Sequence, residues 1–138
     1  ICILEGKKDG VRFRALRETL SVDAFLLLRP RYSSPQQQKE AVEHALQHEG
    51  KLYDFEFDFT RSDRLVCTEV VYRSLEGHDG FHFDLIRKAG RVTLPAEDLL
   101  RQALDSGRMD VIAVAGLKGN HFYEGTRAAG IVTRTLQT

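Results

Sequence analysis

The sequence has 138 residues, of which 42% are hydrophobic and 29% charged, so it is long enough to bury a core and reads as one globular domain over residues 1–138. Lys and Arg together number 20, as do Asp and Glu, and no basic block stands out. This balance argues against nucleic acid or an anionic membrane as a partner. The longest apolar runs, such as AFLLL at 24–28, are too short to cross a bilayer, so no transmembrane segment is expected.

The sequence contains two cysteines, Cys2 and Cys67, without C-x-x-C spacing. This argues against a disulfide framework and against a zinc knuckle. Unpaired cysteines favour a reducing compartment and therefore a cytoplasmic location. Cys2 alternates with Ile1 and Ile3 and is expected to be a simple buried or edge thiol.

The first half of the chain predicts a hairpin, a strand and a helix. Residues 1–5 and 11–16 favour β structure and flank the polar turn GKKDG, and VDAFLLLRP at 22–30 predicts a third strand that Pro30 stops. An amphipathic helix is expected from Ser34, a capping residue followed by Pro35, to a stop at Gly50.

In the second half, LYDFEFDF at 52–59 alternates aromatic and acidic residues, which places its aromatic rings on one face if the segment is extended. The rings are those of Tyr53, Phe55, Phe57 and Phe59. A helix capped by Ser62 or Asp63 is expected to run to Gly77. Short strands in FHFDLI and RVTL, a helix in LPAEDLLRQALDSG and closing strands in MDVIAVAGLKG and RAAGIVTRTLQ complete the pattern. Strands and helices do not alternate strictly, so the prediction is an α+β fold with a mainly antiparallel sheet.

Cys67 is expected in the first turn of the helix that follows the aromatic tract. Unpaired backbone N–H groups and the positive end of the helix dipole favour thiolate over thiol there, as a nucleophile requires. The same N–H groups can stabilise an oxyanion when a carbonyl is attacked. The alternative is a core residue, because Cys67 shares a helix face with Val70, Val71 and Leu75, and free cysteines are often buried.

The run from the aromatic tract through Cys67-Thr68-Glu69-Val70-Val71 resembles the signature of the permuted papain-fold cysteine hydrolases, the YiiX-like branch of the NlpC superfamily. In that family a Tyr-Asp-aromatic tract precedes a Cys-Ser/Thr-Glu helix. The resemblance implies a papain-like domain in which Cys67 is the nucleophile. Tyr53 is the candidate to contact the substrate or an intermediate near Cys67; the alternative is a core aromatic residue, which alternating spacing usually indicates.

The resemblance further implies a histidine on an early strand, oriented by a polar residue on the next strand. ICILEG resembles that second strand, and Glu5 then matches the orienting residue. No histidine precedes Glu5 in the sequence. We therefore expect residues 1–138 to be a piece that lacks its N-terminal strand or strands, with the histidine lying upstream.

The implied chemistry is hydrolysis or acyl transfer at an amide or ester carbonyl through a thioester, with no metal or organic cofactor. The substrate implied is a cell-wall peptide, a lipid or a small amide. The alternative function is a non-catalytic papain-like binding module that has lost its histidine. Nothing in the sequence predicts the oligomeric state.

The histidines within the sequence suggest other roles. His121 lies downstream of Cys67, where an unpermuted papain-like enzyme would carry its histidine, although GNHFYEG resembles a turn. His44 and His48 have the spacing of a metal pair but lack a third ligand, so a solvated polar face is expected. His78 is expected to help end the helix, and His82 to lie opposite Phe81 and Phe83 on an edge strand.

Overall fold

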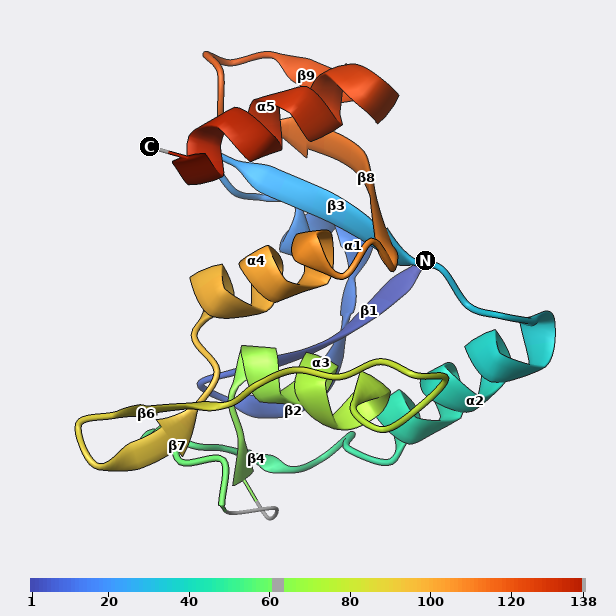
Figure 1. The fold of residues 1–138 in the computed structure, drawn as a ribbon. Coiled ribbons are helices and arrows are strands. Elements are labelled where there is room, and N and C mark those ends of the chain that lie inside the picture. The colour runs from blue at the N-terminus through green and yellow to red at the C-terminus, as the bar shows by residue number, and fades with distance from the viewer. Residues whose placement is uncertain (61–63, 138) are drawn as a thin grey trace.

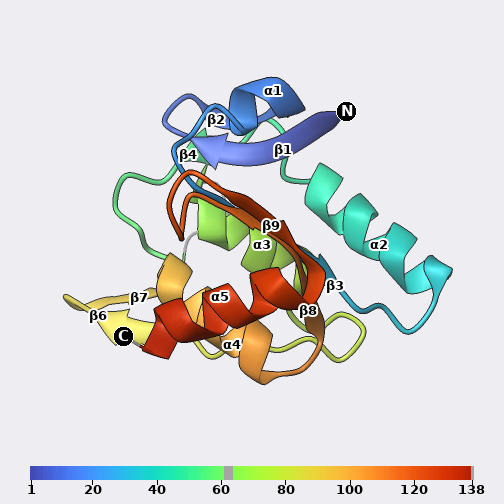
Figure 2. The same ribbon diagram turned by 90° about the horizontal axis from the view of Figure 1, so that it is seen from above.

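The computed structural model describes residues 1–60 and 64–137 and shows an α+β fold in which helices pack on antiparallel strands (Figure 1). At one end of the molecule lies an antiparallel sheet of three strands with β8 in the middle. The strands are β3 (Phe25–Pro30), β8 (Met109–Ala115) and β9 (Phe122–Glu124). The final helix, α5 (Gly125–Gln137), covers one face of this sheet (Figures 1 and 2). The predicted fold class is confirmed.

The predicted N-terminal hairpin is present as β1 (Cys2–Lys7) and β2 (Gly10–Ala15), paired antiparallel. It packs through Leu4 and Val11 against Leu65 and Val70. Val70 belongs to α3 (Cys67–Leu75), which lies beside α2 (Pro35–Leu46) in both views (Figures 1 and 2). The hairpin thus rests on the helix that begins with Cys67.

The remaining elements connect these layers. They are α1 (Leu16–Thr19), the parallel pair β4 (Leu52–Tyr53) and β5 (Arg64–Leu65), the hairpin β6 (Ile86–Lys88) and β7 (Arg91–Thr93), and α4 (Ala96–Asp105). The largest hydrophobic cluster joins α2, α3 and α4 to the loops between them through Ala41, Phe59, Val66, Leu75, Phe81, Phe83, Leu94, Ala103 and Met109. The core therefore directly supports the start of α3, since Val66 belongs to it.

The helix predicted from Ser34 is confirmed with its cap. The Ser34 hydroxyl accepts a hydrogen bond from the Gln37 N–H at 3.2 Å, and Pro35 occupies the first turn. The helix ends at Leu46, ahead of the predicted stop at Gly50, which follows in a turn with a positive φ of 89°.

Three other predictions were wrong in part. RAAGIVTRTLQ forms α5 and not a strand, because Ala128, Ile131 and Val132 recur at helical spacing and pack on the sheet. FHFDLI is irregular up to Ile86, where β6 begins. The helix at Cys67 has Val66 at its N-cap position, and the proposed caps Ser62 and Asp63 lie outside the described residues.

The aromatic tract is also not an extended strand. After Tyr53, the buried carboxylate of Asp54 accepts hydrogen bonds from the N–H groups of Glu56 and Asp58 at 2.9 and 2.7 Å, which folds the tract into a turn. Phe57 has a positive φ of 55° within this turn. Within the described ranges, none of the helices combines the length and the apolar character needed to span a membrane.

Candidate active site

Cys67 is the first residue of α3, and its side chain is exposed. The carbonyl oxygen of Val66 accepts from the N–H groups of Glu69 and Val70 at 3.0 and 3.1 Å. Among residues 1–60 and 64–137, no acceptor is bonded to the N–H of Cys67 or Thr68. Because the thiol is exposed, Cys67 is not a core residue. It lies beside the two free backbone donors, its own N–H and that of Thr68.

The hairpin approaches Cys67 closely through Gly6 of β1. A Cβ on Gly6 would lie 3.4 Å from the backbone nitrogen of Cys67 and from a methyl of Val70. Gly6 itself is buried. A residue without a side chain at this position lets β1 pack directly on the first turn of α3.

Tyr53 reaches the same region from β4. It pairs with Leu65 of β5, two residues before Cys67 in the chain, so the β4–β5 pairing fixes its distance from the helix start. Burial raises the pKa of the Tyr53 hydroxyl, and the adjacent Cys67 and Asp54 raise it further. Tyr53 is therefore a neutral hydroxyl donor, and its hydroxyl takes part in none of the side-chain hydrogen bonds found among the described residues.

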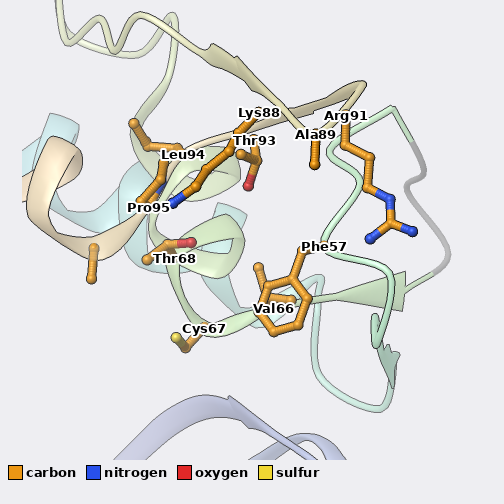
Figure 3. Close-up of a pocket in the computed structure, with 11 residues that line it drawn as sticks. Phe57, Val66, Cys67, Thr68, Lys88, Ala89, Arg91, Thr93, Leu94 and Pro95 are labelled. Carbon is orange, nitrogen blue, oxygen red and sulfur yellow. The ribbon is translucent and has the colours of Figure 1, made fainter.

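A cavity of about 430 Å³ opens beside Cys67 (Figure 3). Its wall is mostly apolar, and its lining comes from the turn after β4, the start of α3, the β6–β7 hairpin and the start of α4. The lining residues are Phe57, Val66, Cys67, Thr68, Lys88, Ala89, Arg91, Thr93, Leu94, Pro95 and Ala96. Cys67 and Thr68 lie at one side, and the hairpin with Lys88 and Arg91 extends across the other (Figure 3). A ligand in this cavity would contact Cys67.

The turn at 54–58 is anchored to the hairpin that faces it. The Phe59 N–H donates to the carbonyl of Val92 in β7 at 2.9 Å, and Arg73 of α3 donates to the Phe59 carbonyl at 2.9 Å. Because Phe59 is held from both sides, the neighbouring Phe57 ring is placed at the cavity wall.

Glu69, in the first turn of α3, is fully buried. Its Oε2 accepts from the Nε of Arg73 at 2.7 Å, while its Oε1 has no hydrogen-bond partner among the described residues. Burial raises the pKa of Glu69, and the bond to Arg73 opposes that shift. The Glu69–Arg73 pair ties the helix carrying Cys67 to the turn at 54–59.

A model of the permuted papain-like amidases, the YaeF/YiiX or C92 family, matches residues 1–125 of the 138. The chain belongs to this family. The resemblance inferred from the motif around Cys67 is thereby confirmed, and the family is one of hydrolases that act on amides. No curated protein and no solved structure matches the chain significantly.

Glu5, which the resemblance to the YaeF/YiiX family matched to the orienting residue, lies apart from Cys67. Leu4 and Gly6 of β1 face α3, so by strand alternation the Glu5 side chain leaves the opposite face. There its carboxylate contacts the Nε of Arg14 at 2.9 Å, Nζ of Lys7 at 3.3 Å and the hydroxyl of Thr19 at 3.4 Å. A role in orienting a histidine therefore stays a prediction.

None of the five histidines lines the cavity beside Cys67 in this amidase-family chain. His121 directly precedes β9, which lies at the far end of the molecule from α3 (Figure 1). His82 is exposed, outside any strand, and bonds the carboxylates of Glu76 and Asp84 at 2.7 and 2.8 Å.

The remaining histidines belong to α2 or follow α2 and α3 in the chain. The predicted polar face of His44 and His48 is wrong, because His48 is buried and follows the end of α2. The buried His78 packs its ring on His44 and bonds the Gln37 carbonyl at 2.8 Å. Its own N–H donates to Leu75, so it does help to end the helix. Among the described residues, no group of three or more His, Cys, Asp or Glu side chains is placed to hold a metal.

Sequence reasoning missed the structural role of Asp54 and the presence of Lys88 and Arg91 at the site. Asp is a common turn residue because its side chain bonds nearby backbone N–H groups, and this signal competed with the aromatic alternation. The two cations carry no motif, and only the tertiary arrangement brings them to the cavity that Cys67 lines.

Proposed function

We propose that the protein is a cysteine amidase in which Cys67 attacks an amide or ester carbonyl and forms a thioester. The observation that carries the proposal is an exposed thiol at the first residue of α3, beside free N–H groups and at the wall of a largely apolar cavity. Membership in a family of amidases supports the same chemistry.

In the first step the Cys67 thiolate attacks the carbonyl carbon, and the electron pair moves to the carbonyl oxygen. That oxyanion is stabilised by the N–H groups at Cys67 and Thr68 and by the Tyr53 hydroxyl. Collapse of the intermediate expels the amine, which takes a proton from a general acid. Water then hydrolyses the thioester and regenerates the thiol.

The general acid in this proposal is a histidine outside the 138 residues. The outer edge of β1 pairs with no strand among those described, since β1 pairs only with β2. A further strand added at that edge would bring a side chain close to Gly6 and so to Cys67. Glu5 is the proposed orienting group, and because its side chain leaves the face of β1 opposite Cys67, this role requires its carboxylate to leave Arg14 and reach the histidine around the edge of β1.

A second candidate function is a binding module that keeps the fold without catalysis. The observation that favours it is that none of the histidines in the sequence lines the Cys67 cavity. The module and the enzyme share the cavity, and they differ in whether the thiol forms a covalent acyl intermediate.

Intact-mass spectrometry of the longest natural chain, incubated with p-nitrophenyl butyrate, separates the two functions. The enzyme predicts a butyryl adduct that maps to Cys67, turns over with time and is missing in Cys67→Ala. Cys2→Ala is the matched control and should retain the adduct. No adduct on Cys67, or equal adducts on both cysteines, would contradict the amidase and favour the module.

A further inference from the structure

Phe57 combines a backbone conformation that bulky residues rarely adopt with a ring that the core does not cover. Its φ is 55°, in the left-handed region, where Gly, Asn and Asp are the usual residues and a side chain as large as Phe is an outlier. Phe57 is 49% exposed, whereas Phe59 is 5% exposed and belongs to the largest hydrophobic cluster. Burial in the core therefore does not offset the cost of the Phe57 backbone conformation.

The residues on both sides of Phe57 hold the turn in this conformation. The Phe57 N–H donates to the Asp54 carbonyl at 3.3 Å, and the buried Asp54 carboxylate accepts two further backbone N–H bonds from the turn. On the other side, Phe59 is bonded to Val92 of β7 and to Arg73 of α3. Strained residues persist where the surrounding structure determines their conformation, and they cluster at active sites and ligand clamps.

The ring that this turn presents forms part of the cavity that Cys67 also lines. It lies on the side of the hollow away from Leu94 and Pro95 (Figure 3). Among the described residues its ring contact is with Tyr53, edge-on, with the ring centroids 6.1 Å apart. An apolar ligand in the cavity would cover ring surface that the protein leaves in contact with water, and this burial favours binding.

We propose that Phe57 determines specificity at this site, because an apolar group of the substrate packs on its ring inside the cavity. The volume of about 430 Å³ suits a small group, since ligand pockets typically measure about 300–1,000 Å³. As a statement about substrate, this rests on the proposed function of Cys67. The contact with Phe57 does not depend on catalysis, so it can be measured with probes that react directly with the thiol.

The experiment compares the rates at which N-benzylmaleimide and N-methylmaleimide label Cys67 in the longest natural chain. The two probes share one electrophile and differ in the apolar group. Peptide mass spectrometry quantifies both cysteines, and the exposed Cys2 is the internal reference. We expect the ratio of the benzyl rate to the methyl rate to be about fivefold higher at Cys67 than at Cys2, as one aromatic pair in contact allows.

Phe57→Gly and Phe57→Asn remove the ring and place residues that tolerate a positive φ. Each should bring the ratio at Cys67 within about twofold of the ratio at Cys2, through a slower reaction with N-benzylmaleimide. The urea midpoint of unfolding should stay the same or rise, because a strained and half-exposed residue is lost.

The matched control is Phe55→Ala. Phe55 belongs to the same turn, is exposed, and has its ring centroid 4.9 Å from that of Tyr53. It is not among the described residues that line the cavity. The variant removes the same kind of ring and should keep the ratio of the parent chain.

Equal ratios at the two cysteines of the parent chain, a raised ratio that survives in both Phe57 variants, or the same loss in Phe55→Ala would each overturn the role of Phe57. A lower urea midpoint in both Phe57 variants would also overturn it, because the ring would then support the fold. Failure of the proposed function gives a different result. The raised ratio would persist while no acyl adduct forms on Cys67, and Phe57 would then select ligands for a site without catalysis.

Discussion

Gly6 of β1 lies against the backbone of Cys67, with a Cβ on Gly6 predicted to fall 3.4 Å from the Cys67 nitrogen. This contact places the hairpin edge beside the free N–H groups at the start of α3. An oxyanion bound there needs free backbone N–H groups at Cys67 and Thr68 as donors, and it needs enough space next to them for the substrate oxygen.

Substitution at Gly6 tests how much room the site requires. A methyl at 3.4 Å is in ordinary contact, so Gly6→Ala should keep Cys67 labelling by iodoacetamide within about twofold of the parent. Gly6→Val adds two further carbons against Val70 and the first turn, and should lower the free energy of unfolding by about 1–3 kcal/mol. Urea unfolding and peptide mass spectrometry measure the two effects. A well-tolerated Val, with unchanged labelling and stability, would contradict this packing.

Tyr53→Phe removes only the hydroxyl that lies near Cys67. If that hydroxyl stabilises the oxyanion, acylation by p-nitrophenyl butyrate should slow by about 100-fold, the usual cost of losing one such donor. The rate of alkylation by iodoacetamide, which forms no oxyanion, should change little. Stopped-flow release of p-nitrophenol measures the first rate. Equal slowing of both reactions would show that Tyr53 acts on the thiol or on folding, and not on the intermediate.

The buried pair of Glu69 and Arg73 is predicted to stabilise the fold. Glu69→Ala leaves Arg73 without this carboxylate and should cost about 3 kcal/mol of unfolding free energy in urea. Glu69→Gln should cost less, because its amide oxygen can still accept from Arg73. The control is the exposed pair of Glu97 and Arg101, which has the same i, i+4 spacing, and Glu97→Ala should cost at most about 0.5 kcal/mol. Similar losses in both pairs would disprove the role of burial.

Two histidines should give stability opposite dependences on pH. Burial and the nearby Lys51 lower the pKa of His48, so the folded state resists a proton that the unfolded state accepts below about pH 6.5. The contribution of His48 to the free energy of unfolding is therefore complete above about pH 6.5, and it is lost as the pH falls below that value. Hydrogen bonds that the His82 ring donates to the carboxylates of Glu76 and Asp84 raise its pKa, so its stabilisation is present below about pH 6.5 and is lost as the pH rises through the higher folded value.

Thermal unfolding between about pH 5 and 8 checks these signs. His48→Gln should reduce the loss of stability on acidification, relative to the parent chain. His82→Gln should lower stability at about pH 5 more than at pH 8. If the two substitutions changed the pH dependence of stability in the same direction, the opposite pKa shifts of His48 and His82 would be contradicted.

The sequence predicted a helix or strand correctly where capping residues and hydrophobic spacing favour the same structure as tertiary packing does. Ser34 and Pro35 mark the start of α2 because a cap bond and a fixed φ act within one turn. The last helix was mistaken for a strand because Ile131 and Val132 have high β propensity, although their spacing from Ala128 is helical. Packing on the sheet decided between these signals.

The candidate site could be predicted only as far as neighbouring residues define it. The helical spacing of the apolar residues after Cys67 predicts that it lies at a helix start. Its exposure to solvent depends instead on the hairpin and the loops around it. The cavity wall joins Phe57, Lys88 and Pro95, which are far apart in the chain. No local pattern records such proximity.

The measurement that tests the central claim most directly is the pH dependence of iodoacetamide labelling at Cys67, followed by peptide mass spectrometry on the longest natural chain. Cys2, also exposed, is the internal control. If Cys67 is the nucleophile, its labelling should stay fast at pH values where labelling of Cys2 has already become slow, because the free N–H groups and the helix dipole favour its thiolate. Coincident pH profiles for the two cysteines would contradict the account and leave Cys67 as an ordinary surface thiol.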